Sequence, residues 1–161
     1  MRSSPKNNLS KSAISAWRVS TLLSMLFLFL IPLTMWMISY LGSGQMSLWI
    51  ISAITFGLVV LAGLAIFFIP EIRWQRWSYQ VDEHEIDLQS GILIITRTLV
   101  PVKRVQHVDT RQGPILRSYG LADVTISTAA TTHRIPALEE ETAEDVRDRI
   151  SKFARLAKED V

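Results

Sequence analysis

Charged side chains are missing from a long stretch near the N-terminus, because no Asp, Glu, Lys or Arg occurs between Val19 and Pro70. Cysteine is missing from the whole chain. The lack of cysteine excludes disulfides, thiolate zinc sites and thiol nucleophiles, and it suits a domain that faces a reducing compartment. The chain therefore divides into an apolar part and a polar part, whereas its length alone predicts one small globular domain.

The charge-free stretch is long enough for two membrane-spanning helices, at about residues 19–41 and 46–69. About 20 apolar residues in helical form cross the hydrocarbon core of a bilayer. Only a short uncharged loop, Gly42-Ser43-Gly44-Gln45, separates them, so we expect an antiparallel hairpin over residues 19–70. A cleaved signal peptide is the alternative for the first helix, but the apolar run is long and lacks a convincing A-x-A site.

Basic residues flank both ends of the predicted hairpin: Arg2, Lys6, Lys11 and Arg18 before it, and Arg73 and Arg76 after it. Positive charge is enriched on the cytoplasmic side of membrane proteins. We therefore predict that the basic segment 1–18 and the polar domain 71–161 both lie in the cytoplasm. The tryptophans, with Trp74 and Trp77 at the exit of the second helix, are predicted to mark the membrane boundaries.

No Asp, Glu, His, Lys or Arg lies inside either predicted helix, which argues against a pump or transporter because those functions rely on such groups within the membrane. Anchoring and helix packing remain. Ala53 and Gly57, with Ala65 further along the same face, would let another helix approach closely. We expect them to pack within the hairpin, and contact with a second protein is the alternative.

From Trp77 onward, apolar and polar residues alternate. This period of two predicts strands at 77–81 and 86–88, a central strand at 92–100 ended by Pro101, and strands at 102–110, 121–128 and 132–135. Residues 114–119 predict one helical turn. Residues 142–157 predict an amphipathic helix, whose Thr142 and Asp145 resemble a capping box. The predicted fold class is a membrane α-helical hairpin followed by a small, bent, mainly-β sheet or partly open barrel that the C-terminal helix closes.

One sequence string carries a resemblance to a known family. The string PVKRVQHVDTRQGPILRSYGLA runs from Pro101 to Ala122 and follows a Ser-Gly-Ile-Leu turn and the two apolar helices. It resembles the bacterial pleckstrin-homology-like membrane proteins of the YdbS type, and the resemblance covers nearly the whole chain. The resemblance implies a PH-like barrel with a C-terminal capping helix, on the cytoplasmic side of the bacterial inner membrane. It implies no particular chemistry.

The sequence offers no starting point for catalysis or for a cofactor. It contains no G-x-S-x-G, H-E-x-x-H or P-loop motif. His84, His107 and His133 lack the spacing of metal ligands, so we predict neither a metal site nor any other cofactor. Charge is nearly balanced outside the N-terminal segment, which gives little support for a nucleic-acid partner. We therefore expect a protein that is not an enzyme.

The polar and turn-forming residues of the string are the candidate binding or structural motif: Lys103, Arg104, Gln106, His107, Asp109, Arg111, Gln112, Gly113, Pro114 and Arg117. On a strand, Arg104 and Gln106 would face one side, and Lys103, His107 and Asp109 the other. One interpretation is that the cations contact anionic lipid headgroups. The other, which we favour, is that the polar side chains bond neighbouring strands and preserve the fold.

Two functional hypotheses follow. The first is a membrane-anchored, non-enzymatic adaptor or scaffold that binds another membrane protein, or a second copy of the chain, at the inner membrane face. It is motivated by a β domain that follows the membrane helix with almost no linker between Ile69 and Trp77. The second is sensing of a membrane lipid or small ligand by the barrel. An enzyme that acts on lipid ranks third, because it would need a polar pocket with perturbed titratable groups.

Overall fold

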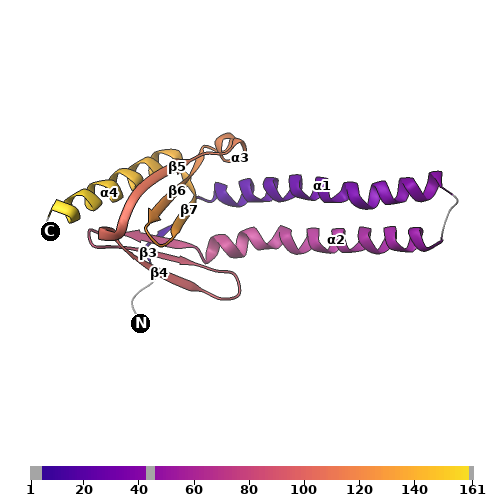
Figure 1. The fold of residues 1–161 in the computed structure, drawn as a ribbon, viewed down its shortest axis with the longest axis horizontal. Coiled ribbons are helices and arrows are strands. Elements are labelled where there is room, and N and C mark those ends of the chain that lie inside the picture. The colour runs from indigo at the N-terminus through magenta and orange to yellow at the C-terminus, as the bar shows by residue number, and fades with distance from the viewer. Residues whose placement is uncertain (1–4, 43–45, 160–161) are drawn as a thin grey trace. The chain divides into compact units, whose positions relative to one another are not determined.

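The computed structural model describes residues 5–42 and 46–159, apart from the side chains of residues 46–47, 65–66 and 158–159. The chain forms two compact units: residues 17–70 make up a helical unit, and residues 1–16 with 71–161 make up a mixed α/β unit. Figure 1 shows the order of the elements along the chain.

The helical unit consists of most of α1 (Ser12–Leu41) and α2 (Met46–Gln75), which are long and apolar enough to cross a membrane. Only 6% of the most apolar window of each helix is buried, which is unlike a core helix of a soluble protein. Side-chain contacts join Phe29 with Phe56 and Trp36 with Trp49. The residue numbers of the partners increase along α1 while they decrease along α2, so the two helices are antiparallel and form the predicted hairpin.

The tryptophans divide between the two units. Trp36 stacks on Tyr40 and meets Trp49 edge-on, at centroid distances of 5.8 and 6.1 Å. Trp77, in contrast, is only 6% exposed, and the Nε1 of Trp74 donates a hydrogen bond to the carbonyl of Leu9 at 2.9 Å. The expectation that these two residues mark the membrane boundary was therefore wrong for Trp77, because the core of the α/β unit buries it.

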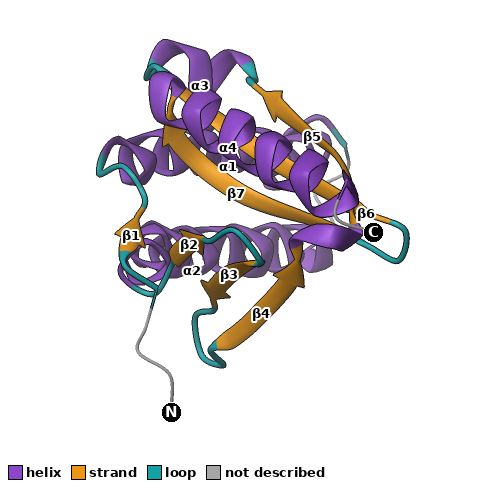
Figure 2. Ribbon diagram, turned by 90° about the vertical axis from the view of Figure 1, so that its left-hand side faces the viewer, coloured by secondary structure: helices purple, strands orange, loops and turns teal. Residues whose placement is uncertain are grey.

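Two antiparallel sheets form the α/β unit (Figure 2). The first has the order β1-β2-β3-β4 and the second the order β5-β6-β7. A 3-10 turn, η1 (Val102–Arg104), joins them. No strand ladder connects the two sheets within the residues that the structure describes, so the predicted barrel stays open. The strands are β1 (Asn7–Asn8), β2 (Ser78–Val81), β3 (Glu85–Ser90), β4 (Thr96–Pro101), β5 (Val105–Arg111), β6 (Leu121–Thr128) and β7 (Thr132–Glu139).

Two helices complete the α/β unit: the short α3 (Pro114–Ser118) and the long α4 (Glu140–Glu159). Ala143, Val146 and Ile150 are buried at helical spacing, and α4 contacts β5, η1 and β6. The helix begins before Thr142, so the expected capping box does not form. Its first N–H, that of Glu140, instead donates to the carbonyl of Gly120 at 3.1 Å, which removes the need for that cap.

The prediction of a central strand at 92–100 was wrong in two respects: where the strand begins and where it lies in the sheet. Residues 92–95 form a loop, and β4 starts at Thr96 and lies at the edge of its sheet. Gly91 causes the difference: its φ is +149°, and a Cβ at this position would lie 2.0 Å from the carbonyl oxygen of Ile94. This backbone conformation, which glycine allows, turns the chain out of the strand before the apolar run begins.

The N-terminal segment and the residues after Pro101 also differ from the prediction. Asn7 and Asn8 pair with Tyr79 and Ser78 of β2, and Leu9 is 3% exposed. A strand of two residues has no detectable period, so the sequence could not indicate it. The predicted strand at 102–110 begins as η1, and β5 carries a bulge between Val105 and His107.

Candidate functional site

A groove lies beside η1, at the point where the chain crosses from the first sheet to the second. It is lined by Leu99 and Pro101 of β4, Lys103 and Arg104 of η1, Gln106 of β5 and His133 of β7, together with the turn between β6 and β7. Its volume is about 630 Å³. We call it the sheet-edge groove, because β4 and β5 are the outermost strands of their sheets on this side.

The 3-10 turn η1 fixes the two cations of the groove. Val102 and Val105 on either side of them are buried, at 0% and 2% exposure. The N–H of Val102 donates to the carbonyl of His84 at 3.0 Å, and the N–H of Val105 donates to the carbonyl of Val102. With the valines buried, Lys103 and Arg104 project into solvent. The turn therefore presents two adjacent positive charges from an ordered backbone.

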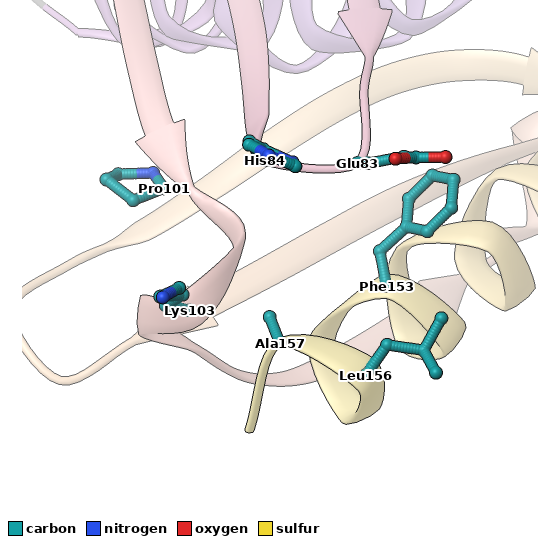
Figure 3. Close-up of a pocket in the computed structure, with 7 residues that line it drawn as sticks. All are labelled: Glu83, His84, Pro101, Lys103, Phe153, Leu156 and Ala157. Atoms are coloured by element: carbon teal, nitrogen blue, oxygen red, sulfur yellow. The ribbon is translucent and has the colours of Figure 1, made fainter. Parts of the chain in front are cut away.

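A second cavity, of about 450 Å³, lies between η1 and α4 (Figure 3). Glu83 and His84 of the β2–β3 turn form one wall, and Phe153 and Ala157 point toward them from α4. Pro101 and Lys103 lie on the side of η1, and Leu156 completes the lining. We call it the helix-side cavity. Its wall on α4 is apolar and the wall opposite is charged, which suits an amphipathic ligand group.

The structure brings together only part of the predicted motif. Lys103, Arg104 and Gln106 gather at the sheet-edge groove. His107, Asp109 and Arg111 are exposed further along β5. Gly113 and Pro114 begin α3, and Arg117 is exposed on that helix.

The network of strand-bonding side chains that we favoured is not seen. The exposed residues Gln106, His107 and Asp109 have no side-chain hydrogen bond within the described part of the chain. Among the motif residues, only Gln112 has a side-chain hydrogen bond in the described part of the chain: its Nε2 donates to the carbonyl of Leu121 at 3.0 Å. The expected alternation of faces also fails, since η1 and the bulge at Val105 interrupt the strand. These side chains are free to meet a ligand or partner.

The predicted packing residues of the membrane helices lie in different surroundings. Ala53 lines a recess of about 510 Å³ beside Phe29 and Pro32, and a Cβ at Gly57 would meet no atom within 4 Å. The side chain of Ala65 lies outside the described residues. The two helices are in close contact at Gly63, where a Cβ would lie 2.8 Å from the sulfur of Met25. Whether Ala53 and Gly57 contact a second protein stays a prediction.

Two buried carboxylates that the sequence did not single out stabilise the α/β unit. Asp87 of β3 is 7% exposed, and Arg97 of β4 binds both of its oxygens. The hydrogen bond to Asp87 holds the pKa of Arg97 above its usual value. Asp123 of β6 is 3% exposed, pairs with Arg134 and accepts the N–H of Ala137 at 2.8 Å. Both buried carboxylates thus have hydrogen-bonding partners within the α/β unit.

Tyr79 and the possible metal ligands are the other polar groups of interest. Burial raises the pKa of Tyr79, a core residue of β2 that is 4% exposed, and keeps its phenol protonated. Across the described ranges 5–42 and 46–159, no three His, Asp or Glu side chains gather in a way that could hold a metal ion.

Two apolar helices, two antiparallel sheets and a C-terminal helix define a membrane-associated protein with a PH-like domain. Residues 19–154 match the family of bacterial PH domains, and the chain belongs to that family. It is 46% identical over 163 residues to the UPF0699 transmembrane protein YdbS of Bacillus subtilis (strain 168), and the match covers 100% of both chains. The resemblance to the YdbS type is therefore confirmed.

A second relative is more distant. The UPF0699 transmembrane protein YdbT of the same organism is 22% identical over 103 residues, which cover 60% of this chain and 21% of YdbT. No solved structure matches the chain. The names of both relatives describe a membrane location and no activity.

Proposed function

We propose that this protein is a non-catalytic adaptor that holds a protein partner at the inner face of the bacterial cytoplasmic membrane. The observation that carries the proposal is the sheet-edge groove, which lies between two strands, β4 and β5, that end their sheets in the described part of the chain. An unpaired strand edge offers backbone N–H and C=O groups to an extended peptide. A partner can therefore bind by adding a strand in the groove.

The side chains around the groove indicate the composition of the partner segment. Leu99 of β4 is 46% exposed and offers an apolar contact. Lys103 and Arg104 add two positive charges, which select partners by charge and speed their association. We expect an extended segment that carries an apolar residue for Leu99 and acidic residues for the two cations.

The chain connectivity favours a partner that is itself close to the membrane. Only Arg76 and Trp77 separate α2 from β2, so the α/β unit is tethered within two residues of the second apolar helix. The basic residues that flank the helices support a cytoplasmic location for the α/β unit by the positive-inside rule. The partner is therefore another membrane protein or a second copy of this chain.

A photo-crosslinking side chain at Gln106, which lines the groove, tests the adaptor function. Asp109 is the matched control position, because it is also exposed on β5 but does not line the groove. The crosslinker is activated in cells, and the full chain is then captured in mild detergent. We expect one reproducible protein adduct from position 106 and none from position 109. Arg104→Glu should reduce that adduct about tenfold, because it reverses a charge that the partner meets.

Mass spectrometry of the adduct distinguishes the two partners, since a second copy gives twice the mass of the chain. Recovery of monomer alone from position 106 would contradict the adaptor function. Equal adducts from positions 106 and 109 would also contradict it, because they would show contact that does not depend on the groove.

Sensing of a lipid or small ligand is the second candidate, and the helix-side cavity favours it. An apolar wall of Phe153, Leu156 and Ala157 faces a wall that carries both Glu83 and Lys103. This lining suits a molecule with an acyl or aromatic part and a polar group that both charges can bind. If it is correct, native mass spectrometry of the purified full chain should show a bound small molecule. Ala157→Phe, which fills the cavity, should remove that mass, while Arg155→Phe on the exposed side of α4 should keep it. Wild-type protein without any added mass would exclude this function.

A further inference from the structure

An apolar loop connects β3 to β4 and is turned toward solvent. We define the apolar loop as residues 92–95. Leu93 is 93% exposed, Ile94 is 81% exposed and Ile95 is 54% exposed. No charged residue occurs from Leu88 to Thr96. Clusters of large exposed apolar side chains mark contact surfaces in proteins, so this loop needs a partner.

The loop has a fixed conformation. Gly91 lets the carbonyl of Ile94 approach to a distance that a Cβ would not tolerate, which folds the loop tightly onto its first residue. At its base, the Nε of Arg97 lies 3.0 Å from both carboxylate oxygens of Asp87, which ties β4 to β3. The exposed side chains of the apolar loop therefore project from an ordered turn.

The loop is bound to the segment that leaves the membrane. A guanidinium nitrogen of Arg76 donates a hydrogen bond to the carbonyl of Ile92. Arg76 follows the end of α2 and comes six residues after Pro70, where the charge-free stretch ends. At 1.5 Å per helical residue, this separation is about 9 Å. The lipid headgroups on each side of the hydrocarbon core occupy about 5–8 Å. The separation slightly exceeds this thickness, so the anchor of the loop lies at the outer boundary of the headgroup layer, within reach of the membrane.

We propose that residues 92–95 insert into the boundary between headgroups and acyl chains of the membrane that α1 and α2 span. The loop would then be a third contact of this protein with lipid, beside the two helices. Its successive Ile and Leu side chains carry no polar group, which favours lipid over a protein site, where polar groups surround an apolar centre. The guanidinium of Arg76 beside it suits the level of lipid phosphates. The insertion does not depend on the sheet-edge groove or its partner.

The natural lack of cysteine makes a direct test possible. A polarity-sensitive fluorophore is attached to Leu93→Cys in the full chain. The protein is then reconstituted in liposomes of zwitterionic and anionic phospholipids. These lipids carry a quencher on the upper part of the acyl chain. We expect a blue-shifted emission that the lipid quencher reduces several-fold. Lys152→Cys, on the exposed face of α4, is the control and should show neither effect.

A second variant tests whether the quenching depends on the apolar character of the loop. Ile94→Asp in the Leu93→Cys chain places a charge on an exposed loop residue and should not unfold the domain. It should expel the loop from the bilayer and abolish quenching, because a charge at the acyl boundary is costly. Emission typical of water from Leu93→Cys would overturn the proposal. A blue-shifted label that the lipid quencher does not affect would overturn it too, because that result indicates a protein partner.

Discussion

Asp123→Ala is expected to lower the free energy of unfolding of the α/β unit by about 2–3 kcal/mol, because it leaves a buried N–H without an acceptor. The carboxylate accepts the N–H of Ala137, at a place where the β6–β7 ladder is interrupted between Ala122 and Val124. Ala137 has a φ of +51°, which turns its N–H away from regular pairing. The side chain of Asp123 thus completes hydrogen bonding that the strands cannot.

Two further variants separate the backbone bond from the ion pair. Asp123→Asn keeps an oxygen for Ala137 and should cost about half as much. Arg134→Ala should cost about 1–2 kcal/mol, less than Asp123→Ala, because the arginine side chain is 62% exposed, although the buried carboxylate loses its charged partner. Urea unfolding of the full chain in mild detergent, followed by near-ultraviolet circular dichroism, measures all three. An equal loss for Arg134→Ala and Asp123→Ala would show that the ion pair, not the backbone bond, dominates.

The membrane helices and most strands could be predicted because their signals are local. An apolar run of about 20 residues without charge predicts a membrane span, whatever the rest of the sequence is. In the same way, the alternation of apolar and polar residues in β2, β3 and β6 predicts strands. These patterns depend on neighbours in sequence, so the residues alone carry them.

The apolar loop shows where a local pattern fails. The β-branched run Ile92–Ile95 has the composition of a buried strand, but the structure turns it into solvent. Periodicity cannot distinguish a buried apolar segment from one whose partner lies outside the domain. The backbone of Gly91 and the bond from Arg76 to Ile92 decide between them, and both are tertiary features.

The candidate site was predicted in part for a similar reason. The sequence singled out Lys103, Arg104 and Gln106, because they belong to a cluster of charged and polar residues. It could not show that His133 and the β6–β7 turn come to the same groove, since these lie more than one strand away along the chain. Nor could it show that α4 faces η1 across a cavity.

Ile150→Ala is expected to destabilise the α/β unit by about 2–5 kcal/mol, the range for removing a large aliphatic side chain from a packed core. Ile150 is 0% exposed and lies on the face of α4 that covers the sheets and η1. Leu156→Ala on the same helix is the matched control. Leu156 is 48% exposed, so its truncation should cost no more than about 0.5 kcal/mol. Thermal or urea unfolding of the full chain in mild detergent measures both values.

The same two variants also test whether α4 supports the binding surface. Because α4 contacts η1, loss of packing at Ile150 should loosen the bond from the N–H of Val102 to the carbonyl of His84. Amide hydrogen exchange at Val102 should therefore speed up in Ile150→Ala and stay unchanged in Leu156→Ala. If the exchange at Val102 does not respond while stability falls, η1 holds its shape without the helix. The cations of the groove would then owe their position to the sheets alone.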